Sequence, residues 1–381
     1  MKNYLNILYI LFITVNVYAN SGGSFQERTV FANGQEGIFG FRIPSVTTAK
    51  DGTVLAFCEA RKESTADCSP TDMVMKYSND NGNTWSQLKL LADGELGSVT
   101  NPTSLVERTT GRIFLFFNRT PAGYNESKVE PGIDGNTVTA WVIYSDDNGR
   151  KWSDPCNITA QAKKNSWSSF AFGPGSAIQT LEGRIIVPCN HGPSPSSSFA
   201  IFSDDLGKSW TIGNDVAPNT NECQLAQLSD GSIMFNMRNL RGPRCRAISV
   251  SSDGGQTWSD VEDDYNLIEP QCQASLISYK PTAQNKPILL FSNPATMGSG
   301  SKGRTHLTVR ISYDDGKSWP YEKIIYTGPS AYSCLTVLKD GSIGCLYEKS
   351  EGPIWGKNLR TIAFAKFDLN WLTDGRSGYY E

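Results

Sequence analysis

The chain has 381 residues, of which 39% are hydrophobic and 19% are charged, so it can bury a core and is neither disordered nor fibrous. Its formal net charge is −3 and it has no run rich in lysine and arginine, which makes nucleic acid and anionic membranes poor candidate partners. Aromatic residues at 11% and 35 glycines are typical of many short strands joined by tight turns.

The first 19 residues have the pattern of an export signal. Lys2 supplies a positive charge, an apolar stretch runs from Leu5 to Val17, and a cleavage site of small residues ends at Ala19. The stretch is shorter than the ~20 residues of a spanning helix, so a retained membrane anchor is the less favoured alternative. We expect residues 1–19 to be a signal peptide and residues 20–381 to form one domain without a stable membrane span. The mature protein would then be secreted or lysosomal, or periplasmic in a bacterium.

Beyond this segment the chain repeats one pattern six times: an apolar run, a turn, and two further apolar runs. The second run of each repeat begins after one of six turn residues: Gly52, Gly111, Gly183, Gly231, Lys286 and Gly341. The length and alternation of the runs predict strands. Six units of three or four strands that close radially form a six-bladed β-propeller. Two packed β-sandwich domains are the alternative, but they would not explain six equal units.

Five repeats carry the sequence Ser-x-Asp-x-Gly-x-(Thr/Ser/Lys)-Trp after their third run. The copies begin at Ser78, Ser145, Ser203, Ser251 and Ser312. Asp and Gly favour a turn, Ser and Asp oxygens can accept hydrogen bonds from backbone N–H groups, and the Trp can fill the gap between neighbouring units. Calcium binding is the alternative interpretation, but each turn has too few carboxylates for it. We therefore predict five structural Asp-box turns.

The nine cysteines and two histidines do not form a metal-binding motif, because no CxxC pair occurs. We expect neither a metal site nor a cofactor. Export would allow disulfide bonds, but the odd number of cysteines leaves at least one thiol unpaired or paired between chains. The sequence does not give the pairing.

The antiparallel order of the strands brings distant polar residues to one rim of the propeller. The start of each first strand, the end of each second strand and the start of each third strand share this rim, whereas the Asp-box turns lie on the opposite rim. Arginines, carboxylates and one tyrosine gather on the shared rim: Arg42, Arg61, Asp67, Glu222, Arg238, Arg304, Tyr332 and Glu348. Such a group predicts a polar site for an anionic ligand.

Several short motifs follow one another along the chain. They are Phe-Arg-Ile-Pro from Phe41, Asn-Glu-Cys-Gln from Asn221, Asn-Met-Arg from Asn236, Ala-Tyr-Ser from Ala331 and Cys-Leu-Tyr-Glu from Cys345. With the five Asp boxes, they resemble the exo-α-sialidase (neuraminidase) family of glycoside hydrolases, closest to its lysosomal-type and secreted bacterial members. The resemblance runs from about Phe41 to Phe367. It implies sialylated glycoproteins, glycolipids and oligosaccharides as substrates, and it leaves room for a protective partner protein if the chain is lysosomal.

The resemblance also implies which residues bind the sugar. Arg42, Arg238 and Arg304 are similar to the arginine triad that clamps the sialic acid carboxylate. Arg61 would contact the O4 side of the sugar. Glu348 would orient Arg42.

Three residues would carry the chemistry that the resemblance implies. Tyr332 is similar to the family's nucleophile, Glu222 to the base that activates it, and Asp67 to the general acid and base. Sialic acid carries a carboxylate on its anomeric carbon, which repels a carboxylate nucleophile but not a neutral phenol. Two successive attacks on one carbon predict hydrolysis with retention through a covalent sialyl-tyrosine intermediate.

Several assignments have rivals. Arg42 could instead be a surface arginine paired with Glu59, and Tyr332 could be a packed aromatic residue. The remaining alternatives are Arg241, Arg244 or Arg246 for Arg238, Arg310 for Arg304, and Asp72 for Asp67. Positions on the rim favour Arg42, Arg238 and Arg304. The family resemblance favours Tyr332 as more than a packed aromatic residue, and it favours Asp67, six residues after Arg61, over Asp72.

Two further functions stand beside hydrolysis. A trans-sialidase would pass sialic acid to another sugar; such enzymes often carry an added lectin domain, for which six blades leave no room in residues 20–381. An inactive sialic-acid-binding propeller would lack one of the three residues of the chemistry, whereas Tyr332, Glu222 and Asp67 are all present. Hydrolysis is therefore favoured, and the linkage preference has no readable signal.

Overall fold

The computed structural model describes residues 23–192, 195–281, 286–352 and 360–376. The predicted signal peptide, residues 1–19, lies outside them. Within the described residues the helices are short: η1 (Gln35–Gly37), α1 (Thr159–Ala162), α2 (Gly300–Gly303) and α3 (Leu369–Thr373). None of these described helices is long and apolar enough to cross a membrane. Strands make up the rest of the regular structure, so the prediction of an all-β fold is confirmed.

Most strands pair with the next strand along the chain, and the described residues form four hydrogen-bonded sheets. The first contains β2 (Gly40–Thr48), β3 (Val54–Arg61), β4 (Thr71–Ser78), β5 (Lys89–Ala92), β6 (Ser98–Val106), β7 (Ile113–Thr120), β8 (Thr139–Ser145), β9 (Cys156–Asn157) and β11 (Gly175–Ser176). The second contains β10 (Ser169–Phe172), β12 (Ile178–Gln179), β13 (Ile185–Gly192), β14 (Ser197–Ser203) and β15 (Thr211–Ile212). The third contains β16 (Thr220–Gln227), β17 (Ile233–Asn239), β18 (Cys245–Ser251) and β19 (Glu262–Ile268). The fourth contains β20 (Ser275–Tyr279), β21 (Ile288–Pro294), β22 (Thr305–Ser312), β23 (Tyr321–Val337), β24 (Ile343–Ser350), β25 (Arg360–Phe367) and β1 (Phe25–Ala32).

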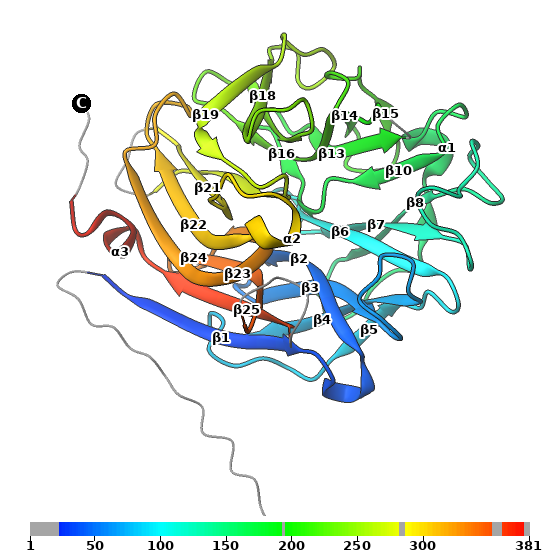
Figure 1. The fold of residues 1–381 in the computed structure, drawn as a ribbon, viewed down its shortest axis with the longest axis horizontal. Helices are drawn as coiled ribbons and strands as arrows, with labels where there is room; N and C mark the ends of the chain where they lie inside the picture. The colour runs from blue at the N-terminus through cyan, green and yellow to red at the C-terminus, as the bar shows by residue number, and fades with distance from the viewer. Residues whose placement is uncertain (1–22, 193–194, 282–285, 353–359, 377–381) are drawn as a thin grey trace, which may run out of the picture.

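The sheets curl around a common centre in a propeller-like arrangement (Figure 1). Contacts of β2 with β6 and with β23, and of β16 with β20, join neighbouring parts of the ring. A strand such as β3 is buried along its whole length, because apolar layers cover both of its faces. This explains why the second run of each repeat is so continuously apolar.

The ring is closed by the two ends of the described chain. β1, from the N-terminal part, pairs antiparallel with β25, from the C-terminal part, in a register from Phe25 opposite Phe367 to Ala32 opposite Thr361. In Figure 1 these blue and red strands lie side by side. The repeat pattern did not predict β1.

The five Asp-box sequences form turns with one hydrogen-bond pattern. In the turn at Ser203, the Ser203 hydroxyl donates to Asp205 at 2.8 Å, and the Gly207 N–H donates to the Ser203 hydroxyl at 2.8 Å. Gly207 has a φ of 84°, a conformation that favours glycine. The serine-to-aspartate hydrogen bond recurs at Ser78, Ser145, Ser251 and Ser312. The turns have local hydrogen-bond partners for their aspartates, as the structural interpretation predicts.

The tryptophans of these turns pack against neighbouring parts of the ring. The ring of Trp152 meets Phe57 edge-on with a centroid distance of 5.7 Å, and that of Trp210 meets Phe116 in the same way at 5.2 Å. Each tryptophan follows a later group of strands than the phenylalanine that it contacts. The predicted filling of gaps between units is therefore seen at these positions.

All nine cysteines have free thiols in this structure. Seven are buried, and Cys68 and Cys156 are exposed. Among the described residues, no group of three or more His, Cys, Asp or Glu side chains could hold a metal ion.

Candidate active site

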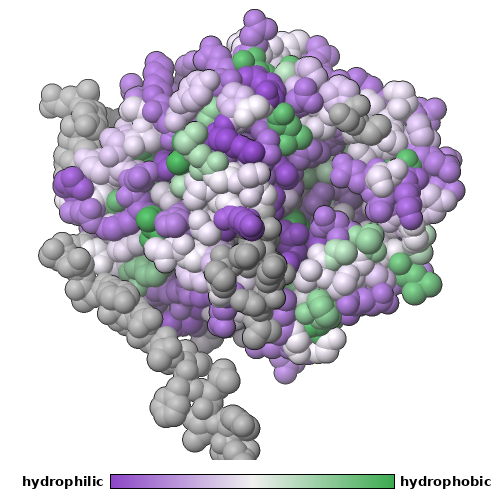
Figure 2. Space-filling model, in the orientation of Figure 1, coloured by the Kyte–Doolittle hydropathy of each residue, from purple (hydrophilic) through white to green (hydrophobic). Residues whose placement is uncertain are grey.

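A cavity of about 580 Å³ opens at the rim where the second strands end. This volume is within the range of small-molecule sites, roughly 300–1,000 Å³. The predicted site residues that line it are Arg42, Arg61, Asp67, Glu222, Arg238, Arg304 and Tyr332. In Figure 2, hydrophilic residues predominate on the face in view and surround a hollow near its middle. The structure thus brings seven of the eight predicted residues to one cavity, and the eighth, Glu348, contacts Arg42 directly.

Interruptions of the strand ladders bring these side chains to the cavity. The pairing register shifts between Arg42 and Ser45 in β2, between Thr220 and Cys223 in β16, and between Ser330 and Ser333 in β23. A bulge bends a strand and re-aims its side chains. Arg42, Glu222 and Tyr332 all lie at such interruptions, next to the cavity.

Tyr332 and Glu222 are in direct contact. The Tyr332 hydroxyl donates a hydrogen bond to Oε1 of Glu222, although the two residues lie 110 positions apart. Burial raises the pKa of Tyr332 well above its usual value, and the charge of Glu222 adds to this, while Arg238 and Arg304 oppose it. The phenol is therefore protonated at neutral pH and is bonded to a carboxylate that can accept its proton.

Three arginines surround the tyrosine. The Arg238 Nη1 donates to Glu222 Oε2 at 2.8 Å, so the carboxylate bridges the phenol and the guanidinium. The guanidinium carbons of Arg42 and Arg304 lie 5.4 and 5.8 Å from the centre of the Tyr332 ring. Within the described residues, the buried Nε atoms of Arg238 and Arg304 have no hydrogen-bond partner. The three arginines line the cavity, where an anionic ligand could accept hydrogen bonds from their guanidinium groups.

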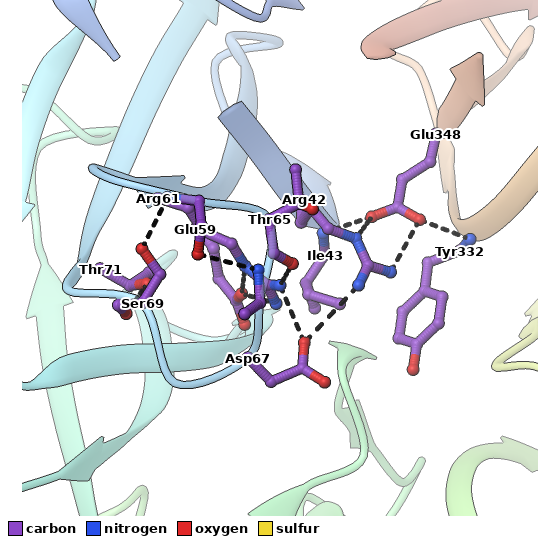
Figure 3. Close-up of polar contacts among 12 residues, drawn as sticks. Arg42, Ile43, Glu59, Arg61, Thr65, Asp67, Ser69, Thr71, Tyr332 and Glu348 are labelled. Carbon is purple, nitrogen blue, oxygen red and sulfur yellow. Dashed lines mark hydrogen bonds and ion pairs between the residues drawn. The ribbon is translucent and has the colours of Figure 1, made fainter. Parts of the chain in front are cut away.

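Glu348 holds both Arg42 and the backbone of Tyr332 (Figure 3). Its Oε1 accepts from Arg42 Nε at 3.0 Å and from the Ile43 N–H at 2.8 Å, and its Oε2 accepts from the Tyr332 N–H at 3.2 Å. Burial raises the pKa of Glu348, but the charge of Arg42 and the hydrogen bonds outweigh it, and the net pKa is lowered. The ionised carboxylate therefore fixes the arginine. The side chain of Arg42 makes no ion pair with Glu59.

Asp67 lies on the loop between β3 and β4, with a side chain that is 86% exposed. Its Oδ1 lies 2.8 Å from Arg61 Nη1 and 3.7 Å from Arg42 Nη1, as Figure 3 shows. Partial desolvation raises the pKa of Asp67, but the charges of Arg61 and Arg42 outweigh it, and the net pKa is lowered. Arg61 is held in turn by Glu59, which accepts from its Nε at 3.0 Å and its Nη2 at 2.7 Å.

Four of the five rival residues have partners elsewhere. Arg246 is fully buried and forms an ion pair with Glu269 at 2.5 Å, and Arg241 forms one with Asp263. Arg310 forms an ion pair with Glu322 at 2.9 Å, and Asp72 forms one with Lys62 at 2.8 Å. None of these four rivals is among the residues that line the cavity.

The sequence did not predict Glu126, which lines the cavity with its neighbour Asn125. Both come from the irregular segment between β7 and β8, where the sequence has no strand pattern. Desolvation raises the pKa of Glu126, and the charges of Glu222 and Asp67 add to this. Glu126 is therefore a further acidic group in the cavity lining, beside Glu59, Asp67 and Glu222. Apolar parts of its wall come from Val138, Phe170 and Ala171.

Comparison with known proteins identifies the family. Residues 52–345 match a family model described as a BNR repeat-like domain. The sialidase of Paraclostridium sordellii is 31% identical, over 94% of this chain and 96% of that protein. The sialidases of Micromonospora viridifaciens and Bacteroides fragilis are 33% and 34% identical over 91% and 83% of this chain. This chain spans only 54% and 61% of the lengths of those two relatives.

Solved structures agree with the sequence comparison. The Hadza microbial sialidase Hz136 superposes with a TM-score of 0.81 and 31% identity, over 91% of this chain and 69% of that chain. An intramolecular trans-sialidase from Ruminococcus gnavus has the same fold, with a TM-score of 0.77 and 22% identity over 90% of this chain and 98% of that one. The fold and its repeated turns define a BNR-repeat protein. The chain belongs to the sialidase family.

Proposed function

We propose that this protein is an exo-α-sialidase, a glycoside hydrolase that removes terminal α-linked sialic acids from glycoproteins, glycolipids and oligosaccharides. The observation that carries the proposal is the hydrogen bond from the Tyr332 phenol to Glu222, inside a cavity lined by four arginines. A buried phenol bonded to a carboxylate and surrounded by cations suits attack on an electrophilic carbon that carries a carboxylate group.

The arginines account for substrate binding. The carboxylate of sialic acid would accept hydrogen bonds from the guanidinium groups of Arg42, Arg238 and Arg304, which line the cavity. Glu348 would keep Arg42 oriented for this contact. Arg61 would contact the O4 side of the sugar.

In the chemical step, the Tyr332 oxygen attacks the anomeric carbon and its proton passes to Glu222. The bond from this carbon to the glycosidic oxygen breaks, and Asp67 gives that oxygen a proton. A covalent sialyl-tyrosine results. Asp67 then takes a proton from water, which attacks the same carbon, and Glu222 returns the proton to the departing phenolate. Two inversions at one carbon give net retention.

Substrate binding would prepare Asp67 for its role as an acid. Arg61 and Arg42 lower the pKa of Asp67 and favour its ionised form. A bound sialic acid carboxylate offsets the charge of Arg42, so the pKa of Asp67 rises and the protonated form becomes more populated. We expect activity to be highest at acidic pH for this reason.

We also propose that the fold is a six-bladed propeller. β2–β5 and β6–β9 are joined in one sheet by a single parallel pair, Thr71 with Ser98, so they count as two blades. The fourth sheet divides at β23, whose first half pairs with β22 and second half with β24. With the second and third sheets, this division makes six blades, five of which end in Asp boxes.

The N-terminal sequence supports a further proposal. Residues 1–19 direct export to the secretory pathway or the periplasm, and residues 20–381 form the catalytic domain. Mass spectrometry of the protein recovered from the medium, from lysosomes or from the periplasm should find Asn20 as the first residue. A chain that retains Met1 would contradict this.

The activity is tested with an aryl α-sialoside and sialyllactose, using wild type, Tyr332→Phe and Asp67→Ala. Wild type should release free sialic acid from both substrates, and Tyr332→Phe should lose at least 100-fold in kcat because it has no nucleophile. Asp67→Ala should lose more activity on sialyllactose than on the aryl substrate, whose better leaving group needs less protonation. Tyr332→Phe with wild-type turnover would contradict the mechanism.

Product analysis separates the alternatives. Transfer of sialic acid to added lactose as the main reaction would indicate a trans-sialidase, and 2,7-anhydro-Neu5Ac as the main product would indicate an intramolecular one. Binding of sialyllactose without any product would indicate an inactive sialic-acid-binding propeller.

A further inference from the structure

The contact between Tyr332 and Glu222 joins two strands, β23 and β16, that are distant in sequence. Both residues lie at interruptions of their strand ladders, between Ser330 and Ser333 and between Thr220 and Cys223. The regular ladder hydrogen bonds therefore do not fix the backbone at either residue. A misplacement of ~1 Å in an active site can cost about 100-fold in rate, so other groups have to hold this contact.

Gln224 anchors the strand that carries Glu222. Its Nε2 donates to the carbonyl of Gly173 at 2.6 Å and to that of Pro174 at 3.1 Å. The side chain is 1% exposed. A Cβ on Gly173 would lie 2.5 Å from the Cys223 carbonyl oxygen, so glycine is required for this close approach.

Gln273 anchors the strand that carries Tyr332. Its Nε2 donates to the carbonyl of Ser333 at 3.0 Å, and its Oε1 accepts from the Ser333 N–H at 3.0 Å. The same Nε2 donates to the Pro174 carbonyl at 2.9 Å. Gln273 and Ser333 are both buried.

The Pro174 carbonyl thus accepts from both glutamines, which uses its two lone pairs. The connection runs from Glu222 through Gln224, Pro174, Gln273 and Ser333 to Tyr332. The side-chain amides of both glutamines are buried and hydrogen-bonded. Buried amides often only satisfy backbone groups. Here, however, the bonded backbone belongs to the residue next to Tyr332, at the point where the ladder is interrupted.

We propose that Gln224 and Gln273 are positioning residues, whose shared hydrogen bonds to the Pro174 carbonyl set the contact between the Tyr332 hydroxyl and the Glu222 carboxylate. The inference rests on the proposed function of the same site. It assigns the two glutamines no contact with substrate.

Gln273→Met tests this inference, because methionine has a similar length but makes none of the three hydrogen bonds. The matched control is Gln179→Met. Gln179 also makes three hydrogen bonds outside the cavity, two to the neighbouring strand group at Glu107 and Arg108 and one to the Gly183 carbonyl in its own hairpin. Gln273→Met should lower kcat by about 10- to 100-fold with KM within about threefold, because Glu348 still holds Arg42. Gln179→Met should keep kcat within twofold.

A second measurement reports on the reactivity of the proposed nucleophile, Tyr332, alone. The rate of covalent labelling by a 2,3-difluorosialic acid should fall in Gln273→Met by the same factor as kcat, and should be unchanged in Gln179→Met. Gln273→Met with kcat and labelling within twofold of wild type, and a melting temperature lowered as in Gln179→Met, would show a purely structural role and overturn the inference.

Gln273→Glu replaces Gln273→Met as the test variant if Gln273→Met does not fold. It keeps an acceptor for the Ser333 N–H, and its protonated carboxyl can donate to one of the two carbonyls. Its kcat relative to wild type should therefore rise as pH falls, and a constant ratio would overturn the inference. Active wild type with an unaffected Gln273→Met contradicts only the positioning role, whereas inactive wild type contradicts the proposed function as well.

Discussion

Glu348 and Glu126 show how two carboxylates near one cavity acquire different properties. Glu348 accepts from Arg42 and from two backbone N–H groups, so its ionised form is stabilised despite burial. Desolvation and the charges of Glu222 and Asp67 raise the pKa of Glu126, and the opposing charge of Arg238 does not outweigh them. As pH falls, Glu126 is therefore protonated before Glu348. The net charge that an anionic ligand meets in the cavity therefore depends on pH.

We predict that Glu126→Gln lowers KM for sialyllactose at pH 7 by about two- to fivefold, the size of a screened charge interaction of ~0.5–1 kcal/mol. The raised pKa of Glu126 means that wild type loses this negative charge as pH falls toward the usual range of a carboxyl group, so the advantage of the variant should shrink there. Steady-state kinetics at pH 7 and pH 4.5 measure this effect.

Glu130→Gln is the control, because Glu130 is exposed on the same segment and does not line the cavity. An equal KM for wild type and Glu126→Gln at pH 7 would show that the charge of Glu126 does not act on the ligand.

At the scale of the element, the Asp-box turn is a unit stabilised by its own sequence. Asp205 accepts from the Ser209 N–H at 2.9 Å and from the Ser209 hydroxyl at 2.6 Å, and these hydrogen bonds lower the pKa of Asp205 to about 2. The adjacent Asp204 instead makes a surface ion pair with Arg184 at 2.7 Å. Asp205 should therefore contribute more to the free energy of unfolding than Asp204.

We predict that Asp205→Asn lowers the free energy of unfolding at pH 5 by about 1–2 kcal/mol, whereas Asp204→Asn changes it by less than ~1 kcal/mol. Because the folded pKa of Asp205 is depressed, its stabilisation is present above the unfolded value of roughly 3.9 and is lost as pH falls through about 2. Urea unfolding at pH 5 and pH 2.5 measures both effects. Equal losses in the two variants at pH 5 would contradict the local account of the turn.

At the scale of the whole molecule, the ring depends on the pairing of β1 with β25. Phe31 of β1 is fully buried, and its ring lies 5.4 Å from that of Phe41, next to Arg42. A strand from the N-terminal part of the chain thus completes the sheet of the C-terminal part and supports the start of β2. Closure of the ring by β1 therefore also supports the position of Arg42 in the site.

We predict that Phe31→Ala lowers the free energy of unfolding by about 3–5 kcal/mol, the usual cost of a phenylalanine cavity in a core. Phe39→Ala is the control, because Phe39 is 51% exposed, and it should change stability by less than ~0.5 kcal/mol. Chemical denaturation of both variants measures the difference. A Phe31→Ala protein as stable as wild type would show that β1 contributes little to closure.

The sequence by itself determined the strands, the Asp-box turns and the identity of most site residues. These features depend on local chemistry: alternating apolar runs favour strands, and a Ser-x-Asp-x-Gly turn contains its own hydrogen-bond partners. The Phe-Arg-Ile-Pro motif at Phe41 and the Ala-Tyr-Ser motif at Ala331 marked Arg42 and Tyr332 through the family resemblance. Antiparallel strand order was enough to predict that these residues share a rim.

Only the tertiary structure decided which of these groups touch. The bond from Tyr332 to Glu222 spans 110 positions and that from Arg42 to Glu348 spans 306, and no local pattern encodes either. Glu126 lies in an irregular segment whose path depends on the surrounding strands, so its place in the cavity had no sequence signal. The pairing of β1 with β25 likewise follows from closure of the ring, which exists only when all the sheets are packed.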